Sequence, residues 1–181
     1  LANGKTAALD YRETAPAAAS RDMYLDQNGN VIKGKSVNGH LSSGVPGTIA
    51  GLFESARYAK LPFRKLIQPA IDLAGKGFTL TEREAASFNS IQDDLNEFNT
   101  TPSIFQKKDK WKAGDTLIQK DLANTLKRIR DKGVKGFYEG TTAKLIVDEM
   151  KRGGGIVTVN DLKNYKAKWR APLEFDYKGY H

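Results

Sequence analysis

The chain of 181 residues contains no cysteine, which excludes disulfide bonds and metal sites built on thiolates. A lack of cysteine is compatible with a periplasmic or secreted bacterial protein, although cytosolic proteins can lack it too. Only two histidines are present, His40 and His181, and they are too few and too far apart in sequence to predict a metal site. We therefore expect neither a metal ion nor another cofactor.

Long apolar runs are also missing. No segment approaches the roughly 20 consecutive apolar residues that a transmembrane helix requires, so no association with a membrane is expected. No signal peptide is recognisable. The chain begins with Leu1 rather than methionine, and it ends at His181 directly after a strand-like segment. These features predict that residues 1–181 are a partial domain that is truncated at both ends.

No complete catalytic motif is present. The glycines at Gly34 and Gly39 have the wrong spacing for a nucleophile elbow. Gly153-Gly154-Gly155 is not followed by the lysine and hydroxyl residue of a phosphate-binding loop, so it is interpreted as the end of a helix. Paired carboxylates and a recognisable serine or threonine nucleophile are absent as well. The chain is therefore predicted to supply part of a site rather than a whole one.

The formal net charge is +8, from 29 lysines and arginines against 21 acids. Such a balance raises nucleic acid or an anionic membrane as a partner. The basic residues are spread along the chain, however, and the densest run, Lys127–Lys132, contains an acid and no interleaved aromatics for base stacking. A solvated helix face is favoured, and no nucleic-acid partner is expected. A non-catalytic basic helical binding module stays open as an alternative of a different class.

Apolar residues recur at helical spacing through most of the chain, which predicts a mostly helical α+β fold. Capping patterns begin helices at Thr81, expected to run to Phe98, and at Thr158, and another helix is expected from Asp115 or Thr116. A hairpin is expected around Asp26–Asn30, where Asn-Gly suits a tight turn. Short strands are expected near residues 5–12 and 172–180, where apolar and polar residues alternate.

Arg12 is the candidate binding residue. The weak alternation of Ala7, Leu9 and Tyr11 predicts a strand that Pro16 ends, so Arg12 would lie near a strand end. A guanidinium there can bind a carboxylate through two parallel hydrogen bonds. The alternative is a structural ion pair with a neighbouring acid, and composition alone favours it; the candidates are Glu13 and Asp22.

The glycine-rich loop His40–Thr48 leads into a predicted helix. Exposed amides in such a loop could bind an anion. The alternative is a tight turn packed against a neighbouring backbone, and this simpler interpretation is favoured.

Short motifs follow one another along the whole chain. They are Leu9–Pro16, Arg21–Tyr24, Ser43–Thr48, Gln68–Ala74, Gly77-Phe78, Gly114–Leu117, Phe137–Gly140, Gly154–Thr158 with Asp161, Leu162 and Tyr165, and Tyr177–Tyr180. Each is weak alone, but the ordered set resembles the large subunit of γ-glutamyltranspeptidase.

The resemblance implies an αββα sandwich of the N-terminal-nucleophile hydrolase class and a precursor that cleaves itself into two subunits. The first threonine of the small subunit would attack a γ-glutamyl amide such as glutathione, and the acyl group would pass to water, an amino acid or a peptide. In that family the arginine of an Arg-Glu-x-Ala-Pro motif binds the substrate α-carboxylate, a role that falls on Arg12. Neither Thr100-Thr101 nor Thr141-Thr142 matches the context of the nucleophile, so no catalytic residue is expected in this chain.

The resemblance thus predicts a heterodimer with a small subunit, in a periplasmic or secreted setting. A related acylase or a capsule-processing transpeptidase of the same superfamily stays open as an alternative. Retention of Arg12 within Arg-Glu-Thr-Ala-Pro favours glutamyl substrates.

Overall fold

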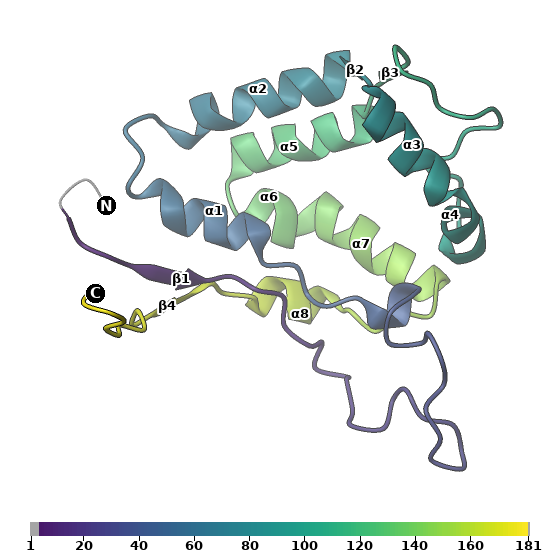
Figure 1. Cartoon of the computed structure of the whole chain (residues 1–181), viewed down its shortest axis with the longest axis horizontal. Helices are drawn as coiled ribbons and strands as arrows, with labels where there is room; N and C mark the ends of the chain where they lie inside the picture. Colours follow the sequence, from purple (N-terminus) through teal and green to yellow (C-terminus); the bar gives the residue numbers. More distant parts are fainter. Residues whose placement is uncertain (1–3, 181) are drawn as a thin grey trace.

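The computed structural model describes residues 4–180 of the chain (Figure 1). Within this range a 3-10 turn, η1 (His40–Ser42), precedes a series of α-helices. They are α1 (Thr48–Ala56), α2 (Phe63–Lys76), α3 (Glu82–Ser90), α4 (Gln92–Phe98), α5 (Lys120–Lys132), α6 (Lys135–Tyr138), α7 (Gly140–Arg152) and α8 (Val159–Asn164). The strands are β1 (Ala8–Asp10), β2 (Phe78–Thr79), β3 (Thr116–Leu117) and β4 (Lys168–Arg170). The predicted mostly helical α+β class is confirmed, and no helix in this range is long and apolar enough to cross a bilayer.

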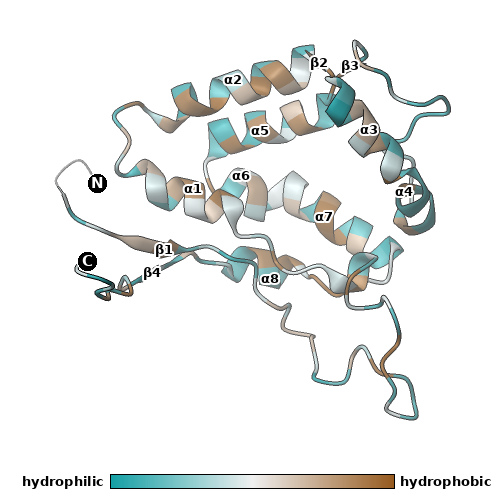
Figure 2. Cartoon of the chain, viewed as in Figure 1, coloured by the Kyte–Doolittle hydropathy of each residue, from teal (hydrophilic) through white to brown (hydrophobic). Residues whose placement is uncertain are grey.

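The first of two hydrophobic clusters lies where α2 packs along α5 (Figure 1). Ile67 and Ile71 of α2 and Ile129 of α5 are buried there. Both helices carry apolar residues on one side and polar residues on the other, as the hydropathy colouring in Figure 2 shows. Burial of each such isoleucine stabilises the fold by about 1.5–3 kcal/mol, so the amphipathic pattern of the two helices is sufficient to explain their pairing.

The second cluster joins the start of α1 to α6, α7 and α8. Its buried members are Val45, Ala50, Tyr138, Ala143, Val147, Val157 and Leu162. Leu162 is completely buried, and the short helix that carries it begins with a capping box between Thr158 and Asp161. The predicted caps at Thr81 and Thr158 are both confirmed. Because α8 contacts both α6 and α7, the residues that follow it are held close to this core.

The strands form two small antiparallel pairs in the described residues. β1 pairs with β4, with Ala8 opposite Arg170, and β2 pairs with β3. The strand expected near residues 5–12 is confirmed, but the one expected near 172–180 is wrong. Among the described residues this segment forms no ladder: Leu173 is 96% exposed, only Tyr177 and Tyr180 make an isolated bridge, and the strand that precedes them is β4. Alternation marks a potential strand, but a ladder needs a partner.

Three further expectations are modified by tertiary contacts. The helix expected from Asp115 or Thr116 begins only at Lys120, because residues 116–117 pair with β2 instead. The helix that begins after Thr81 is interrupted at Ile91, so α3 and α4 are separate. The hairpin is confirmed in reduced form, since Leu25 and Val31 make a single bridge around the predicted turn.

Two helical glycines give a matched test of packing. A Cβ at Gly51 in α1 would lie 2.2 Å from Cγ of Tyr11, whereas a Cβ at Gly75 in α2 would have no heavy atom closer than 3.6 Å. We expect Gly51→Ala to destabilise the protein by about 1–3 kcal/mol through overpacking. Gly75→Ala should stabilise it by about 0.4–1 kcal/mol, because alanine lowers the entropy of the unfolded chain. Thermal unfolding measures both, and equal melting temperatures for the two variants would contradict the close approach of Tyr11 to α1.

Candidate functional site

An open hollow of about 650 Å³ lies where the chain leaves β1 and passes the loop before α1. One wall consists of residues 9–13 and the other of Gly44 and residues 46–48. A second, smaller hollow of about 220 Å³ lies between Arg12 and the segment that leads into β4. Asp10, Arg12 and Glu13 line both of them, so this segment lies between the two hollows.

The guanidinium of Arg12 is exposed, at 82% of its side-chain surface. Its Nε donates a hydrogen bond of 3.0 Å to Oε1 of Glu13. The other acid considered from the sequence, Asp22, pairs with Arg21 instead. Because Glu13 takes only the Nε edge, the two terminal nitrogens of Arg12 remain a planar pair of donors for a second carboxylate.

The backbone of Arg12 is held on both sides. Its amide donates to Oδ1 of Asp10 at 3.1 Å, and its carbonyl accepts a 2.7 Å hydrogen bond from the hydroxyl of Tyr165. Hydrogen bonds from Arg170 and then from the Arg12 amide hold the pKa of Asp10 below its usual range, so Asp10 is an ionised acceptor. Two residues further on, Thr14 and Val45 exchange backbone hydrogen bonds across the hollow.

The loop before α1 packs tightly against this segment. A Cβ at Gly47 would lie 2.1 Å from the carbonyl oxygen of Tyr11 and 2.0 Å from the hydroxyl of Tyr165. A Cβ at Gly44 would lie 2.9 Å from Cγ of Glu13. Only glycine allows these approaches, and the φ of Gly47 is −106°, so packing rather than backbone conformation requires it. The interpretation of this loop as a tight turn against a neighbouring backbone is confirmed.

Tyr138 anchors the same loop from the core side. Its buried hydroxyl donates to the carbonyl of Pro46 at 2.7 Å and accepts from the amide of Ala50 at 3.3 Å. Burial raises the pKa of Tyr138 to about 12, so the hydroxyl keeps its proton at neutral pH. Its ring is stacked on that of Tyr165, with centroids 5.8 Å apart. Sequence reasoning missed this pair, because the two residues lie in different helical segments and no motif of the chain links them.

The arrangement can be compared with known proteins. The sequence model of the family described as gamma-glutamyltranspeptidase matches residues 1–181. The chain belongs to the γ-glutamyltranspeptidase family. A glutathione hydrolase proenzyme from Pseudomonas sp. (strain A14) is 46% identical over 184 residues, which cover 100% of this chain and 32% of that protein. The chain thus spans about a third of this curated relative.

Two solved structures support the assignment. Helicobacter pylori γ-glutamyltranspeptidase superposes with a TM-score of 0.95 at 42% identity, covering 99% of this chain and 52% of that one. The transpeptidase enzyme CapD of Bacillus anthracis superposes with a TM-score of 0.71 at 32% identity, covering 99% and 55% respectively. The mostly helical chain with small sheets is therefore a portion of the N-terminal-nucleophile hydrolase fold of γ-glutamyltranspeptidases, as the sequence predicted.

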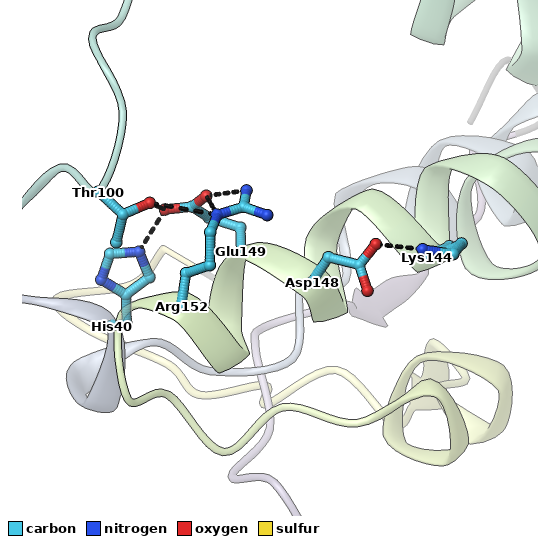
Figure 3. A network of polar contacts seen from close by, with 6 residues as sticks. All are labelled: His40, Thr100, Lys144, Asp148, Glu149 and Arg152. Atoms are coloured by element: carbon cyan, nitrogen blue, oxygen red, sulfur yellow. Dashed lines mark hydrogen bonds and ion pairs between the residues drawn. The ribbon is translucent and has the colours of Figure 1, made fainter.

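This γ-glutamyltranspeptidase segment has a second polar cluster at the end of α7, centred on Glu149 (Figure 3). Thr100 donates to Oε1 of Glu149 at 2.6 Å, His40 Nε2 lies 2.8 Å from the same oxygen, and Arg152 pairs with Oε2. The hydrogen bonds from Thr100 and His40, with a smaller contribution from Arg152, lower the pKa of Glu149 to about 2. The cluster joins three chain segments that the sequence gives no reason to associate.

The triple glycine also belongs to this cluster. A Cβ at Gly153 would lie 2.1 Å from Nδ1 of His40, so the end of α7 needs a glycine to make room for that ring. The predicted helix end is confirmed, and the close approach explains why it carries no side chain. Across residues 4–180 no three His, Asp or Glu side chains are grouped as they would be around a metal ion, and His181 lies outside the described residues.

The cluster predicts a pH dependence of stability. Because the pKa of folded Glu149 is about 2 and its ordinary value is 4.5, its contribution is fully present above pH 4.5 and is lost as the pH falls towards 2. We expect Glu149→Gln to lower the melting temperature at neutral pH and to weaken its decline over this window. Melting curves at several pH values test this, with Glu97→Gln as a control at an exposed position of α4. Parallel curves for Glu149→Gln and the wild type would contradict it.

Proposed function

We propose that this chain, residues 1–181, is part of the large subunit of an enzyme that cleaves γ-glutamyl amides such as glutathione and transfers the γ-glutamyl group to water, amino acids or peptides. In this proposal the nucleophile is the first threonine of a small subunit made from the same precursor, and that subunit is the partner of this chain. The chain would accordingly supply no catalytic residue of its own. Membership of a family whose curated relatives include bacterial glutathione hydrolase proenzymes supports this function. A periplasmic or secreted location is part of the same proposal.

The role proposed for Arg12 is to bind the α-carboxylate of the γ-glutamyl group. The observation that carries it is the exposed guanidinium of Arg12, which gives its Nε to Glu13, keeps its terminal nitrogens as donors and belongs to a residue that lines two hollows. A carboxylate that binds end-on to this edge accepts two parallel hydrogen bonds. The ion pair with Glu13, which composition favoured as a purely structural role, then restrains the guanidinium without blocking it.

Binding at this point orients the rest of the substrate. The α-carboxylate and the γ-carbonyl lie at opposite ends of the glutamyl group, so anchoring one end limits where the other can reach. Holding a reacting carbonyl at a defined position beside a nucleophile lowers the entropic part of the barrier. The chain would thus contribute to catalysis through binding and orientation, while the bond-breaking chemistry belongs to the partner subunit.

Substitution of Arg12 in the full-length, processed enzyme tests this role. We expect Arg12→Ala to raise KM by roughly ten- to a hundredfold, since a charge-assisted hydrogen bond contributes about 1.5–3 kcal/mol. Arg12→Lys should raise KM less, because lysine keeps the charge but loses the two-pronged geometry. Steady-state kinetics with a γ-glutamyl anilide measure both variants.

The decisive control is a matched substrate whose α-carboxylate is amidated. The effect of Arg12→Ala should be confined to the free acid. If Arg12→Ala raises KM equally for the acid and the amide, the proposal that Arg12 binds the α-carboxylate is wrong. A purely structural ion pair with Glu13 would instead lower the melting temperature and leave KM near that of the wild type.

A second prediction concerns the chain by itself. The purified 181-residue chain should release no product from a γ-glutamyl anilide, because it lacks the nucleophile. The full-length enzyme assayed at the same concentration is the positive control. Measurable turnover by the chain alone, in a preparation free of full-length enzyme, would refute the assignment of the nucleophile to the small subunit.

A further inference from the structure

Arg12 lies in a short irregular span between two regions of backbone pairing. β1 ends at Asp10, and the next backbone contact across the hollow is the bridge from Thr14 to Val45. Residues 11–13 between them belong to no strand. The orientation of the Arg12 backbone within this span therefore depends on individual contacts rather than on a sheet ladder.

Tyr165 makes one of these contacts from a distant part of the chain. Its hydroxyl donates to the carbonyl of Arg12 at 2.7 Å, across a sequence separation of 153 residues. Burial raises the pKa of Tyr165, and the nearby Asp10 and Glu13 raise it further, so the hydroxyl stays a proton donor at neutral pH. The hydroxyl thus binds the backbone carbonyl of Arg12 and not its guanidinium.

The position of the Tyr165 hydroxyl is itself tightly defined. Tyr165 directly follows α8, whose Leu162 is completely buried in the core. Its ring lies almost parallel to that of Tyr138, with an interplanar angle of 6°. On the other side, the absence of a Cβ at Gly47 leaves just enough room for the hydroxyl. Tyr165 is thus a rigid donor held by the core rather than a mobile surface side chain.

We propose that Tyr165 is a positioning residue for Arg12, holding its backbone so that the guanidinium edge meets the substrate carboxylate in the geometry of a two-pronged contact. The inference rests on the proposed role of Arg12. Two parallel hydrogen bonds to a planar carboxylate tolerate little misplacement, so a residue that orients the Arg12 backbone affects binding without touching the substrate.

The test is Tyr165→Phe in the full-length, processed enzyme, which removes the hydroxyl and keeps the stacked ring. We expect KM for the free-acid γ-glutamyl substrate to rise about three- to tenfold, the range that follows from losing one neutral hydrogen bond, with kcat changed less than twofold. KM for the substrate with an amidated α-carboxylate should stay at the wild-type value. In an Arg12→Ala background, Tyr165→Phe should have no further effect on the acid, because the two residues act as one unit.

Tyr24→Phe is the matched control. The hydroxyl of Tyr24 donates to the carbonyl of Leu41 at 3.3 Å, so the same atom is removed from another tyrosine-to-backbone hydrogen bond outside the Arg12 segment. We expect Tyr24→Phe to leave both KM values unchanged. If Tyr165→Phe yields too little folded enzyme, p-fluorophenylalanine at position 165 makes the same test, because fluorine fills the place of the hydroxyl without donating a proton.

The outcomes separate this inference from the proposed function. If Arg12→Ala selectively raises KM for the free acid and Tyr165→Phe does not, the positioning role of Tyr165 is overturned. The proposed binding of the α-carboxylate by Arg12 is then retained. The positioning role is also overturned if Tyr165→Phe raises KM equally for acid and amide, or if its effect persists in the Arg12→Ala background. If Arg12→Ala raises KM without selectivity for the free acid, both proposals are overturned: the binding of the α-carboxylate by Arg12 and the positioning role of Tyr165.

Discussion

The loop before α1 and the first turn of α1 lie so close to Tyr11 that glycine is required at two positions of the contact. At Gly47 and Gly51 any side chain would overlap with atoms of Tyr11, and at Gly47 it would also overlap with Tyr165. The N-terminal segment therefore lies directly against the start of α1, which in turn packs on the core through Ala50. This close approach fixes the backbone next to Arg12, and the same two segments line the hollow beside it.

Two tyrosines connect this contact to the hydrophobic core. The buried hydroxyl of Tyr138 makes hydrogen bonds with the backbone of Pro46 and Ala50, so Tyr138 binds the loop from the core side. Tyr165 is stacked on it and binds the backbone of Arg12. A buried hydroxyl without a partner is costly, so these two contacts favour one orientation of the Tyr138 ring. A surface-exposed arginine is thereby attached to a rigid support, which is what a binding residue on an irregular segment requires.

The charges around Arg12 are arranged so that local acids are already engaged. Asp10 accepts hydrogen bonds from Arg170 and from the amide of Arg12, and Glu13 accepts from Nε of Arg12. These exposed pairs contribute little to stability, because solvent screens them. Their effect is on orientation: the acids restrain the backbone of Arg12 and one edge of its guanidinium, and they leave the terminal nitrogens as donors. The Glu149 cluster near the end of α7 instead joins three segments of the chain through the contacts of one carboxylate.

Local sequence signals by themselves determined the helices, the capping boxes at Thr81 and Thr158, the helix end at Gly153 and the turn around Gly29, because these depend on residues within a few positions of one another. The ordered motifs also determined the family and singled out Arg12. Tertiary structure alone decided that residues 116–117 pair as a strand and that Tyr138 and Tyr165 meet beneath Arg12. Such contacts join residues tens to more than a hundred positions apart. Hydrophobic periodicity does not encode them, since it specifies which face of an element is buried and not which distant element covers it.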